Sequence, residues 1–192
     1  MNVLIIHTHP NPNSFNHAIL EQVEQGLKDG NHSYTVIDLY ADNFNPVLVY
    51  NAQIKRRDLV NDEETAHYRE LIKQADHLIF IYPIWWYGAP AMLKGFIDRV
   101  FVSGFAYTST GKLPKGLFTD KSAWVIYTID SPSWFVKLFR KSIEWKVMKK
   151  AVLNFCGVKN IKRTMLADVK NSNLAGRQKW LELIYRQARI LK

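Results

Sequence analysis

The amino-acid sequence predicts an α/β fold in which five parallel strands form one sheet with helices on both faces. Five short segments are typical of β-strands, and two of them, residues 2–8 and 77–83, are apolar runs typical of strands buried on both sides. They alternate with segments in which apolar residues recur every three or four positions, the spacing of helices that pack on a sheet. No repeat, low-complexity tract or flexible linker interrupts this alternation, so we expect residues 1–192 to form a single domain.

The first half of the chain opens with an apolar run at residues 2–8, which predicts a buried strand. Apolar residues then recur every four positions in a helix that Asn13 or Ser14 should cap and Gly30 should end. Alternating apolar and polar side chains predict the second strand at residues 34–39. A long connection follows, for which the sequence predicts no structure.

The central segment begins with a helix for which Asn61 and Glu64 have the spacing of a capping box. His77–Pro83 is another apolar run of the buried-strand type. Gly88 should permit the turn after this strand, and Pro90 suits the first position of a third helix. The turn and the strand end therefore lie close together.

Beyond the third helix, residues 102–120 are expected to form a loop, and residues 122–128 predict the fourth strand. From Phe139 to Phe155 apolar residues keep a four-residue spacing, which predicts one continuous helix that ends at Gly157.

The chain closes with a fifth strand at Ile161–Ala167 and a last helix that follows the caps Ser172 and Asn173. Rossmann-like and flavodoxin-like strand orders are both compatible with this alternation. In either order, ligands bind outside the carboxyl ends of the strands, where the strand order reverses.

Composition and charge exclude several functional classes. The chain has 26 Lys and Arg against 17 Asp and Glu, a formal charge of +9. The basic residues scatter along the chain after Lys112 without a nucleic-acid-binding module, so we expect a solvated basic face, or attraction of phosphate, rather than nucleic-acid recognition. The single Cys156 ends an apolar stripe and fits a reducing compartment. No apolar stretch is long enough to span a bilayer, and a cytoplasmic protein is expected.

Loops that should meet at the carboxyl edge of the sheet comprise residues 9–16, 83–88 and 128–134. The first offers Ser14, Asn16 and the free amides of a helix N-terminus, which together suit a phosphate group. It contains no glycine. This excludes the glycine-rich dinucleotide fingerprint and the P-loop, because both need glycines for close approach of the backbone.

The second loop places Trp85, Trp86 and Tyr87 consecutively in a turn, where the three rings cannot all be buried. Flat aromatic faces beside a phosphate site suit a planar ring system such as a flavin. The alternative is that two of the rings fill the gap between the third strand and the next helix. His7 and His9 should point to one side of a strand, but no third ligand has a metal-site spacing, so no metal site is expected.

Two blocks of sequence resemble the flavodoxin-like NAD(P)H:quinone reductases. They are HTHPNPNSFN, after the first strand, and FIYPIWWYGAPAMLKGFIDRVFVSGFAY, from the third strand through the next helix; DLYADNFNP is similar to a further family segment. The resemblance is good up to Tyr107, and beyond it TIDSPSWF and LNFCGVK resemble a bacterial branch of the family more than the mammalian enzymes. It implies the flavodoxin-like fold.

The resemblance also implies a function. It implies a flavin-dependent NAD(P)H oxidoreductase that reduces quinones, or nitroaromatic or azo compounds, by two electrons in a ping-pong cycle. FMN or FAD would be the cofactor, NAD(P)H the electron donor and a homodimer the assembly. The wider family supports an alternative, a regulatory flavoprotein subunit bound to a membrane transporter. The basic charge argues against a one-electron flavodoxin carrier, since true flavodoxins are usually strongly acidic.

Site residues carry over from the resemblance by position. The phosphate end of the flavin would contact His9, Ser14, Phe15 and Asn16, the ring would contact Pro83, Ile84, Trp85, Trp86 and Tyr87, and a third segment would supply Thr128, Ile129 and Asp130. In that third segment the related reductases often have Thr-Thr-Gly-Gly. This chain departs from that pattern, so its contacts there are expected to differ.

The chain also departs from the mammalian enzymes in the groups assigned to charge on the reduced flavin. Those enzymes have a Tyr and a nearby His after the fourth strand, whereas here the matching aromatic is Phe135 and every histidine lies at or before His77. The charge must instead be met by backbone amides, by Ser131 or Ser133, or by a basic side chain such as Lys137.

Overall fold

The central sheet has the strand order β2-β1-β3-β6-β7 in the computed structural model, which describes residues 1–109 and 113–192. All neighbouring strands in it run parallel, and they are β1 (Asn2–His7), β2 (Ser33–Asp38), β3 (His77–Pro83), β6 (Ser122–Ile129) and β7 (Ile161–Ala167). This is the flavodoxin-like order and not the Rossmann order. The fold predicted from the sequence is confirmed, with strand ends that differ by at most one residue.

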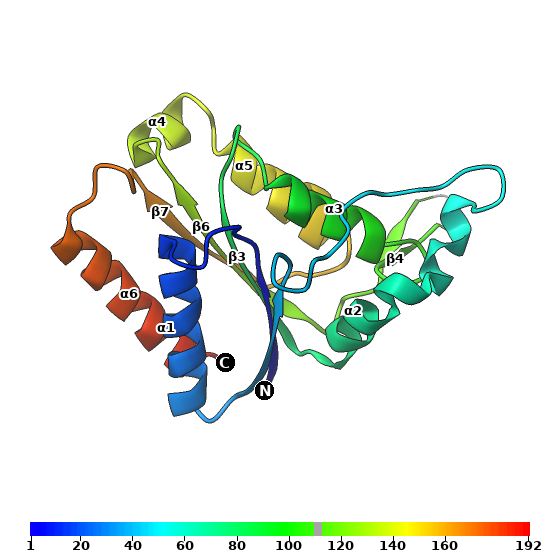
Figure 1. Ribbon diagram of the computed structural model, residues 1–192, viewed down its shortest axis with the longest axis horizontal. Coiled ribbons are helices and arrows are strands. Elements are labelled where there is room, and N and C mark those ends of the chain that lie inside the picture. Colours follow the sequence, from blue (N-terminus) through cyan, green and yellow to red (C-terminus); the bar gives the residue numbers. More distant parts are fainter. Residues whose placement is uncertain (110–112) are drawn as a thin grey trace.

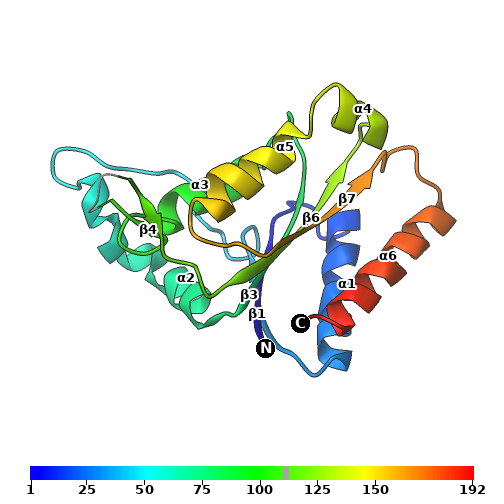
Figure 2. The same ribbon diagram turned by 180° about the vertical axis from the view of Figure 1, so that it is seen from behind.

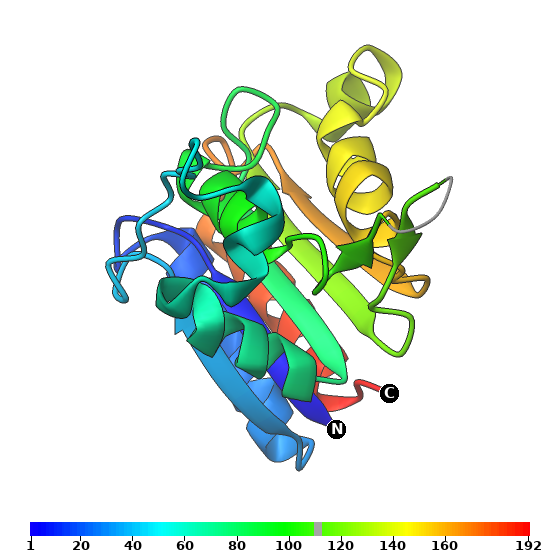
Figure 3. The same ribbon diagram turned by 90° about the vertical axis from the view of Figure 1, so that its right-hand side faces the viewer.

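Helices cover both faces of the sheet, and side chains that alternate along each strand enter two cores. On one face α1 (Phe15–Asp29) and α6 (Leu174–Arg189) pack on residues such as Val3, Ile5 and Trp124. On the other, α2 (Glu63–Gln74) and α3 (Ala91–Val100) pack on residues such as Leu4 and Phe80. Figures 1 and 2 show the two helical layers from opposite sides, and Figure 3 shows the sheet between them.

Caps fix where the helices begin. Ser14 caps α1 by accepting a hydrogen bond from the backbone N–H of His17 at 3.2 Å, as the sequence predicts. The predicted capping box at the start of α2 is wrong, because Asp62 is the cap and accepts from the N–H of Glu64 at 3.1 Å. Asn173 caps α6, accepting from Gly176 at 2.8 Å.

The segment that follows β6 is broken where the sequence predicts one helix. It forms α4 (Ser133–Leu138), α5 (Ile143–Lys146) and a π-helix, η2 (Val147–Asn154). Lys141 and Ser142 both adopt φ of +50°, which ends helical geometry between α4 and α5. A strict four-residue spacing drifts by about 40° per step around an α-helix, and the wider π turn absorbs that drift. The spacing therefore indicated a helical segment but not its interruption.

Short elements also occupy the two long connections. A 3-10 helix, η1 (Arg56–Asn61), lies before α2, and β4 (Tyr107–Thr108) pairs antiparallel with β5 (Lys115–Gly116) in the stretch predicted as a loop. Cys156, at the end of its apolar stripe, is buried in the core, and burial raises the pKa of its thiol to about 12. None of the helices in the described residues is long and apolar enough to cross a membrane.

Candidate functional site

The strand order reverses between β1 and β3, and the loops after β1, β3 and β6 meet there. They enclose a hollow of about 230 Å³ that is lined by His9, Ser14, Phe15, Asn16, Pro83, Ile84, Trp85, Thr128, Ile129, Asp130 and Val169. A second hollow of about 190 Å³ is lined by Ile84, Trp86, Tyr87, Ile129, Asp130 and Ser131. The two adjoin, since they share Ile84, Ile129 and Asp130. Every residue that the resemblance assigns to flavin contact lines one hollow or both.

A larger cavity of about 340 Å³ lies elsewhere, among residues 45–64 and Arg99. Its charged groups already pair with one another. Arg99 donates to Glu64 at 2.8 Å and to Asp62 at 2.9 Å, and the hydrogen bond from Arg99 lowers the pKa of Glu64. This cavity stands away from the strand ends where ligands bind in such sheets, so size alone does not make it the better candidate.

The N-terminus of α1 forms the polar end of the first hollow. Its first amides have no partner within the helix, and they and the helix dipole favour an anion. Asn16 is buried, and its Nδ2 donates to Oγ1 of Thr128 at 2.9 Å, which joins the loop after β1 to the end of β6. The Oδ1 of Asn16 is buried and has no hydrogen-bond partner among the described residues. A ligand hydroxyl or N–H in the hollow can satisfy this oxygen.

The turn after β3 presents the aromatic side chains. Trp85 and Gly88 exchange two backbone hydrogen bonds, N–H of Trp85 to O of Gly88 at 3.1 Å and N–H of Gly88 to O of Trp85 at 2.9 Å. Between them, Trp86 has φ of +52° and Tyr87 has φ of +57°, which makes a type I′ turn. Gly88 closes the predicted turn through these hydrogen bonds, but it does not itself adopt a positive φ. Two bulky residues adopt the left-handed conformation instead, at a cost of about 1–2 kcal/mol each.

Exposure separates the two interpretations of this aromatic turn. The Trp86 side chain is 101% exposed and that of Trp85 is 42% exposed. Trp86 therefore fills no gap in the core, and the expectation of an exposed ring is confirmed. The indole face of Trp86 is free to contact a planar ligand in the second hollow.

Arg140 lies against Tyr87, which lines the second hollow, although the sequence did not single it out. Its guanidinium carbon lies 4.7 Å from the centre of the Tyr87 ring and 5.6 Å from that of Phe135. The hydroxyl of Tyr87 is 3.0 Å from Oγ of Ser131. Arg140 reaches this place because the chain turns directly after it, a break that the continuous helix predicted from the sequence could not include. Lys137 is exposed on α4.

The two histidines of the first loop occupy different surroundings. His9 lines the first hollow, its Nδ1 accepts from the N–H of Asn11 at 3.0 Å, and burial lowers its pKa. His7 is buried in β1 and bonds Asp38 at 2.9 Å; burial lowers its pKa more than the nearby Asp38 raises it. The sequence pairs His7 with His9, but in the structure it is His17 and Asp38 that lie beside His7, and neither has a recognisable ligand spacing in the sequence.

The third segment is held from both sides. The carbonyl of Thr128 accepts from the N–H of Ile84 at 2.8 Å, and the carboxylate of Asp130 accepts from the N–H of Lys170 at 3.2 Å. Val169, beside Lys170, lines the first hollow although it belongs to no recognisable motif. The loop after β7 thus supports the loop after β6.

These features define an α/β protein of the flavodoxin type with a partly aromatic hollow at the switch point of its sheet. Residues 1–184 match the family described as having a flavodoxin-like fold, and the chain belongs to that family. It is 33% identical over 186 residues to an uncharacterized NAD(P)H oxidoreductase of Haemophilus influenzae, covering 95% of this chain and 92% of the relative.

Solved structures are similar over the whole chain. The crystal structure of the Streptococcus mutans protein Smu.1420 has 44% identity and a TM-score of 0.94, with 100% of both chains covered. An NAD(P)H:quinone oxidoreductase from Methanothermobacter marburgensis has 31% identity and a TM-score of 0.88, covering 100% of this chain and 99% of that one.

Proposed function

We propose that this protein is a flavin-dependent NAD(P)H oxidoreductase that reduces quinones or similar acceptors by two electrons. One observation carries the proposal: a helix N-terminus, whose free amides suit an anion, and exposed aromatic rings line adjoining hollows at the switch point of the sheet. The names of two full-length relatives, an NAD(P)H oxidoreductase and an NAD(P)H:quinone oxidoreductase, support it.

The residues of the first hollow suit the phosphate and ribityl parts of FMN or FAD. The amides that begin α1 would bind phosphate, and Ser14 would hold that end of the helix in place by its cap. The free Oδ1 of Asn16 would accept from a ribityl hydroxyl, while the bond from Asn16 to Thr128 keeps the amide oriented. His9 and Phe15 would enclose this end.

The aromatic turn and the third segment would hold the flavin ring. Trp85, Trp86 and Tyr87 offer ring faces, and Ile129 offers an apolar surface from β6. Held by these residues, a flavin would supply hydride transfer, with NAD(P)H and the acceptor using the same site in turn as a ping-pong cycle requires. Arg140 would place a positive charge beside the ring system, where it stabilises negative charge that develops on reduction.

We also propose that residues 1–192 act as a single domain and that two chains associate into a homodimer. Large apolar side chains are exposed from the end of α4 to the start of η2, including Leu138, Phe139, Ile143 and Val147. Contiguous exposed apolar surface of this kind is typical of an interface. Light scattering at micromolar concentration should give twice the mass of the chain, and a monomer with full activity would contradict the assembly.

The decisive experiment is flavin reconstitution followed by anaerobic reduction. Protein mixed with FMN or FAD should retain a yellow cofactor after gel filtration, and NADH or NADPH should bleach it. Addition of a quinone or azo compound should restore the colour. Failure to retain either flavin would refute the proposal. Retention without reduction by either nicotinamide would favour the alternative of a regulatory flavoprotein subunit on a membrane transporter.

A further inference from the structure

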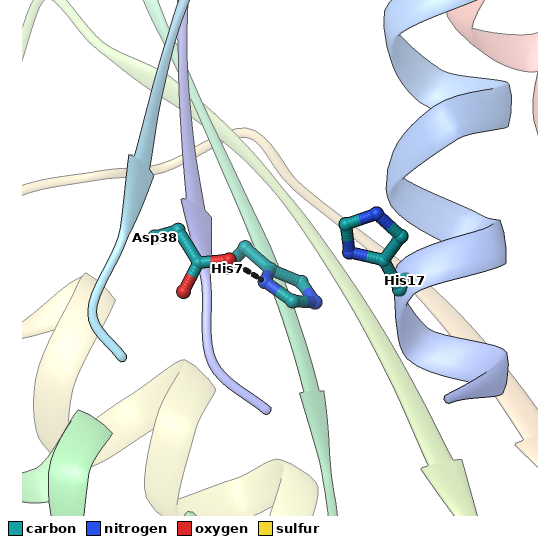
Figure 4. A group of neighbouring side chains, drawn as sticks. All are labelled: His7, His17 and Asp38. Atoms are coloured by element: carbon teal, nitrogen blue, oxygen red, sulfur yellow. Dashed lines mark hydrogen bonds and ion pairs between the residues drawn. The ribbon is translucent and has the colours of Figure 1, made fainter. Parts of the chain in front are cut away.

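A group of metal-ligating side chains lies outside both hollows. His7 ends β1, Asp38 ends β2 and His17 stands near the start of α1. One potential ligand atom from each residue lies within 4.8 Å of the other two. Figure 4 shows the ring of His17 turned toward His7, with Asp38 on the opposite side of the His7 ring. Three separate elements therefore converge on one point.

Hydrogen bonding in this group leaves two ring nitrogens without partners. Nδ1 of His7 lies 2.9 Å from Oδ2 of Asp38; an ionised carboxylate only accepts, so Nδ1 donates and Nε2 keeps its lone pair. Nε2 of His7 and Nδ1 of His17 are both buried and have no hydrogen-bond partner among the described residues. The two rings meet edge to face with centroids 5.7 Å apart. A buried nitrogen without a partner costs free energy, and a shared cation removes that cost.

We propose that His7 and His17 bind one divalent transition-metal ion, through Nε2 and Nδ1 respectively, and that Asp38 orients His7. Imidazole nitrogen suits Zn²⁺, Cu²⁺ and Ni²⁺, and metal-ligating histidines commonly donate their other N–H to a carboxylate. Asp38 is itself held, since its Oδ1 accepts from the N–H groups of Tyr40 and Ala41 at 3.1 and 3.2 Å. Water would complete the coordination, as in sites that keep open positions.

Binding one zinc ion requires the two ring nitrogens to approach each other, and the side chain of His17 can supply that movement. Zn–N bonds of about 2.0–2.1 Å in a tetrahedral site place two ligand nitrogens about 3.3 Å apart. The His17 side chain is 34% exposed, so its ring can rotate toward the fully buried His7. The strand end that carries His7 does not have to move.

An ion at this position should also affect ligand binding in the first hollow. His7 and His17 flank residues 8–16, the segment that contains Ser14 and Asn16. An ion bound to both histidines ties the two ends of this segment together, so Zn²⁺ should raise the affinity for FMN. That consequence rests on the proposed function. The metal site itself is tested on flavin-free protein, so failure of one proposal is distinguishable from failure of the other.

The test is a zinc titration of the EDTA-treated, flavin-free chain in competition with a chromophoric chelator. We expect one Zn²⁺ per chain. His17→Gln should weaken binding by about 100-fold or more, and Asp38→Asn by about 10–100-fold, the usual effect of losing an orienting carboxylate. His67→Gln, which replaces an exposed histidine on α2, is the matched control and should bind as the parent chain does.

A second measurement does not depend on variants of the buried His7. X-ray absorption of the zinc-loaded parent protein should show two imidazole nitrogens at about 2.0–2.1 Å. The proposal is overturned by absence of stoichiometric binding at micromolar zinc, by unchanged affinity in His17→Gln, or by a spectrum without two imidazoles.

Discussion

The amino ends of the parallel strands form one edge of the central sheet, the amino edge, and their carboxyl ends form the other, the carboxyl edge. Both edges carry buried polar groups, but the surroundings of those groups differ. At the amino edge Lys121 donates to the carbonyls of Ala75 at 2.7 Å and of Lys73 at 3.1 Å, and His77 pairs with Ser122 at 2.6 Å. These groups close the ends of strands and helices. At the carboxyl edge, toward the top of Figure 1, the Oδ1 of Asn16 has no partner and aromatic rings stand in solvent. The Nε2 of His77 is also buried without a partner among the described residues, so an open polar atom occurs at both edges. The carboxyl edge differs because its open atom lies beside exposed aromatic rings and a helix N-terminus, and that combination indicates a ligand.

The largest expected effect is a loss of folding stability in acid, and it arises at the amino edge. Burial, with a smaller contribution from the charge of Lys162, lowers the pKa of His77 from 6.5 to about 4. The unfolded chain therefore binds a proton more readily than the folded chain between these values, and stability falls as the pH falls from 6.5 toward 4. The loss attributable to this shift is about 3 kcal/mol.

Urea unfolding at pH 7 and pH 4 measures this loss. His77→Asn keeps a polar group near the position of Nδ1 but does not titrate, so it should lose less stability between the two pH values than the parent chain. His67→Asn, at an exposed histidine, should behave as the parent does. If His77→Asn lost as much stability between pH 7 and pH 4 as the parent chain, protonation of His77 would not be the cause of the loss.

The same comparison explains what the sequence could predict. The strands, the helix layers and the residues around the hollows follow from apolar spacing and from motifs that are contiguous in sequence, as at Trp85, Trp86 and Tyr87. The backbone state of those residues could not be predicted, because local sterics favour Gly88 for a left-handed turn and the surrounding structure overrides them.

Contacts between distant elements were also beyond the sequence. Arg140 lies against Tyr87 only because Lys141 and Ser142 break the predicted helix. His7 and His17 have no recognisable ligand spacing, and Asp38 joins them only through the parallel pairing of β1 and β2. Residues brought together by tertiary structure leave no local pattern to detect.

A second prediction sharpens the comparison at the aromatic end of the carboxyl edge. Trp86→Ala should weaken flavin binding by about 1–3 kcal/mol, since it removes a ring face without disturbing the core. Stability should change little, because the side chain is fully exposed. Fluorescence titration with FMN measures the affinity. Trp134→Ala, at an exposed tryptophan that lines neither hollow, is the control; an equal loss in both variants would contradict specific stacking.

A third prediction concerns the polar end, where structure and binding share one residue. Asn16→Ala removes the hydrogen bond to Thr128 and should lower the free energy of unfolding by about 1–2 kcal/mol, with a similar loss of flavin affinity. Urea unfolding and FMN titration measure the two effects. Asn13→Ala, an exposed residue of the same loop, should alter neither by as much. Loss of stability with unchanged affinity would assign Asn16 to structure alone.

The smallest expected effect concerns backbone strain in the aromatic turn. It tests whether Trp86 destabilises the flavin-free fold and is explained by ligand binding instead. Trp86 occupies the first central position of a type I′ turn with φ of +52°, a position that asparagine tolerates far better than a bulky aromatic residue. Because the Trp86 ring makes no core contact to lose, Trp86→Asn should raise the free energy of unfolding by about 0.5–1 kcal/mol while it weakens flavin binding. Urea unfolding of the flavin-free protein measures this gain in stability. Trp134→Asn, at a residue with the helical geometry of α4, should give no gain in stability. A variant that is less stable than the parent chain would mean that the turn is not strained, and that the exposed indole stabilises the fold itself.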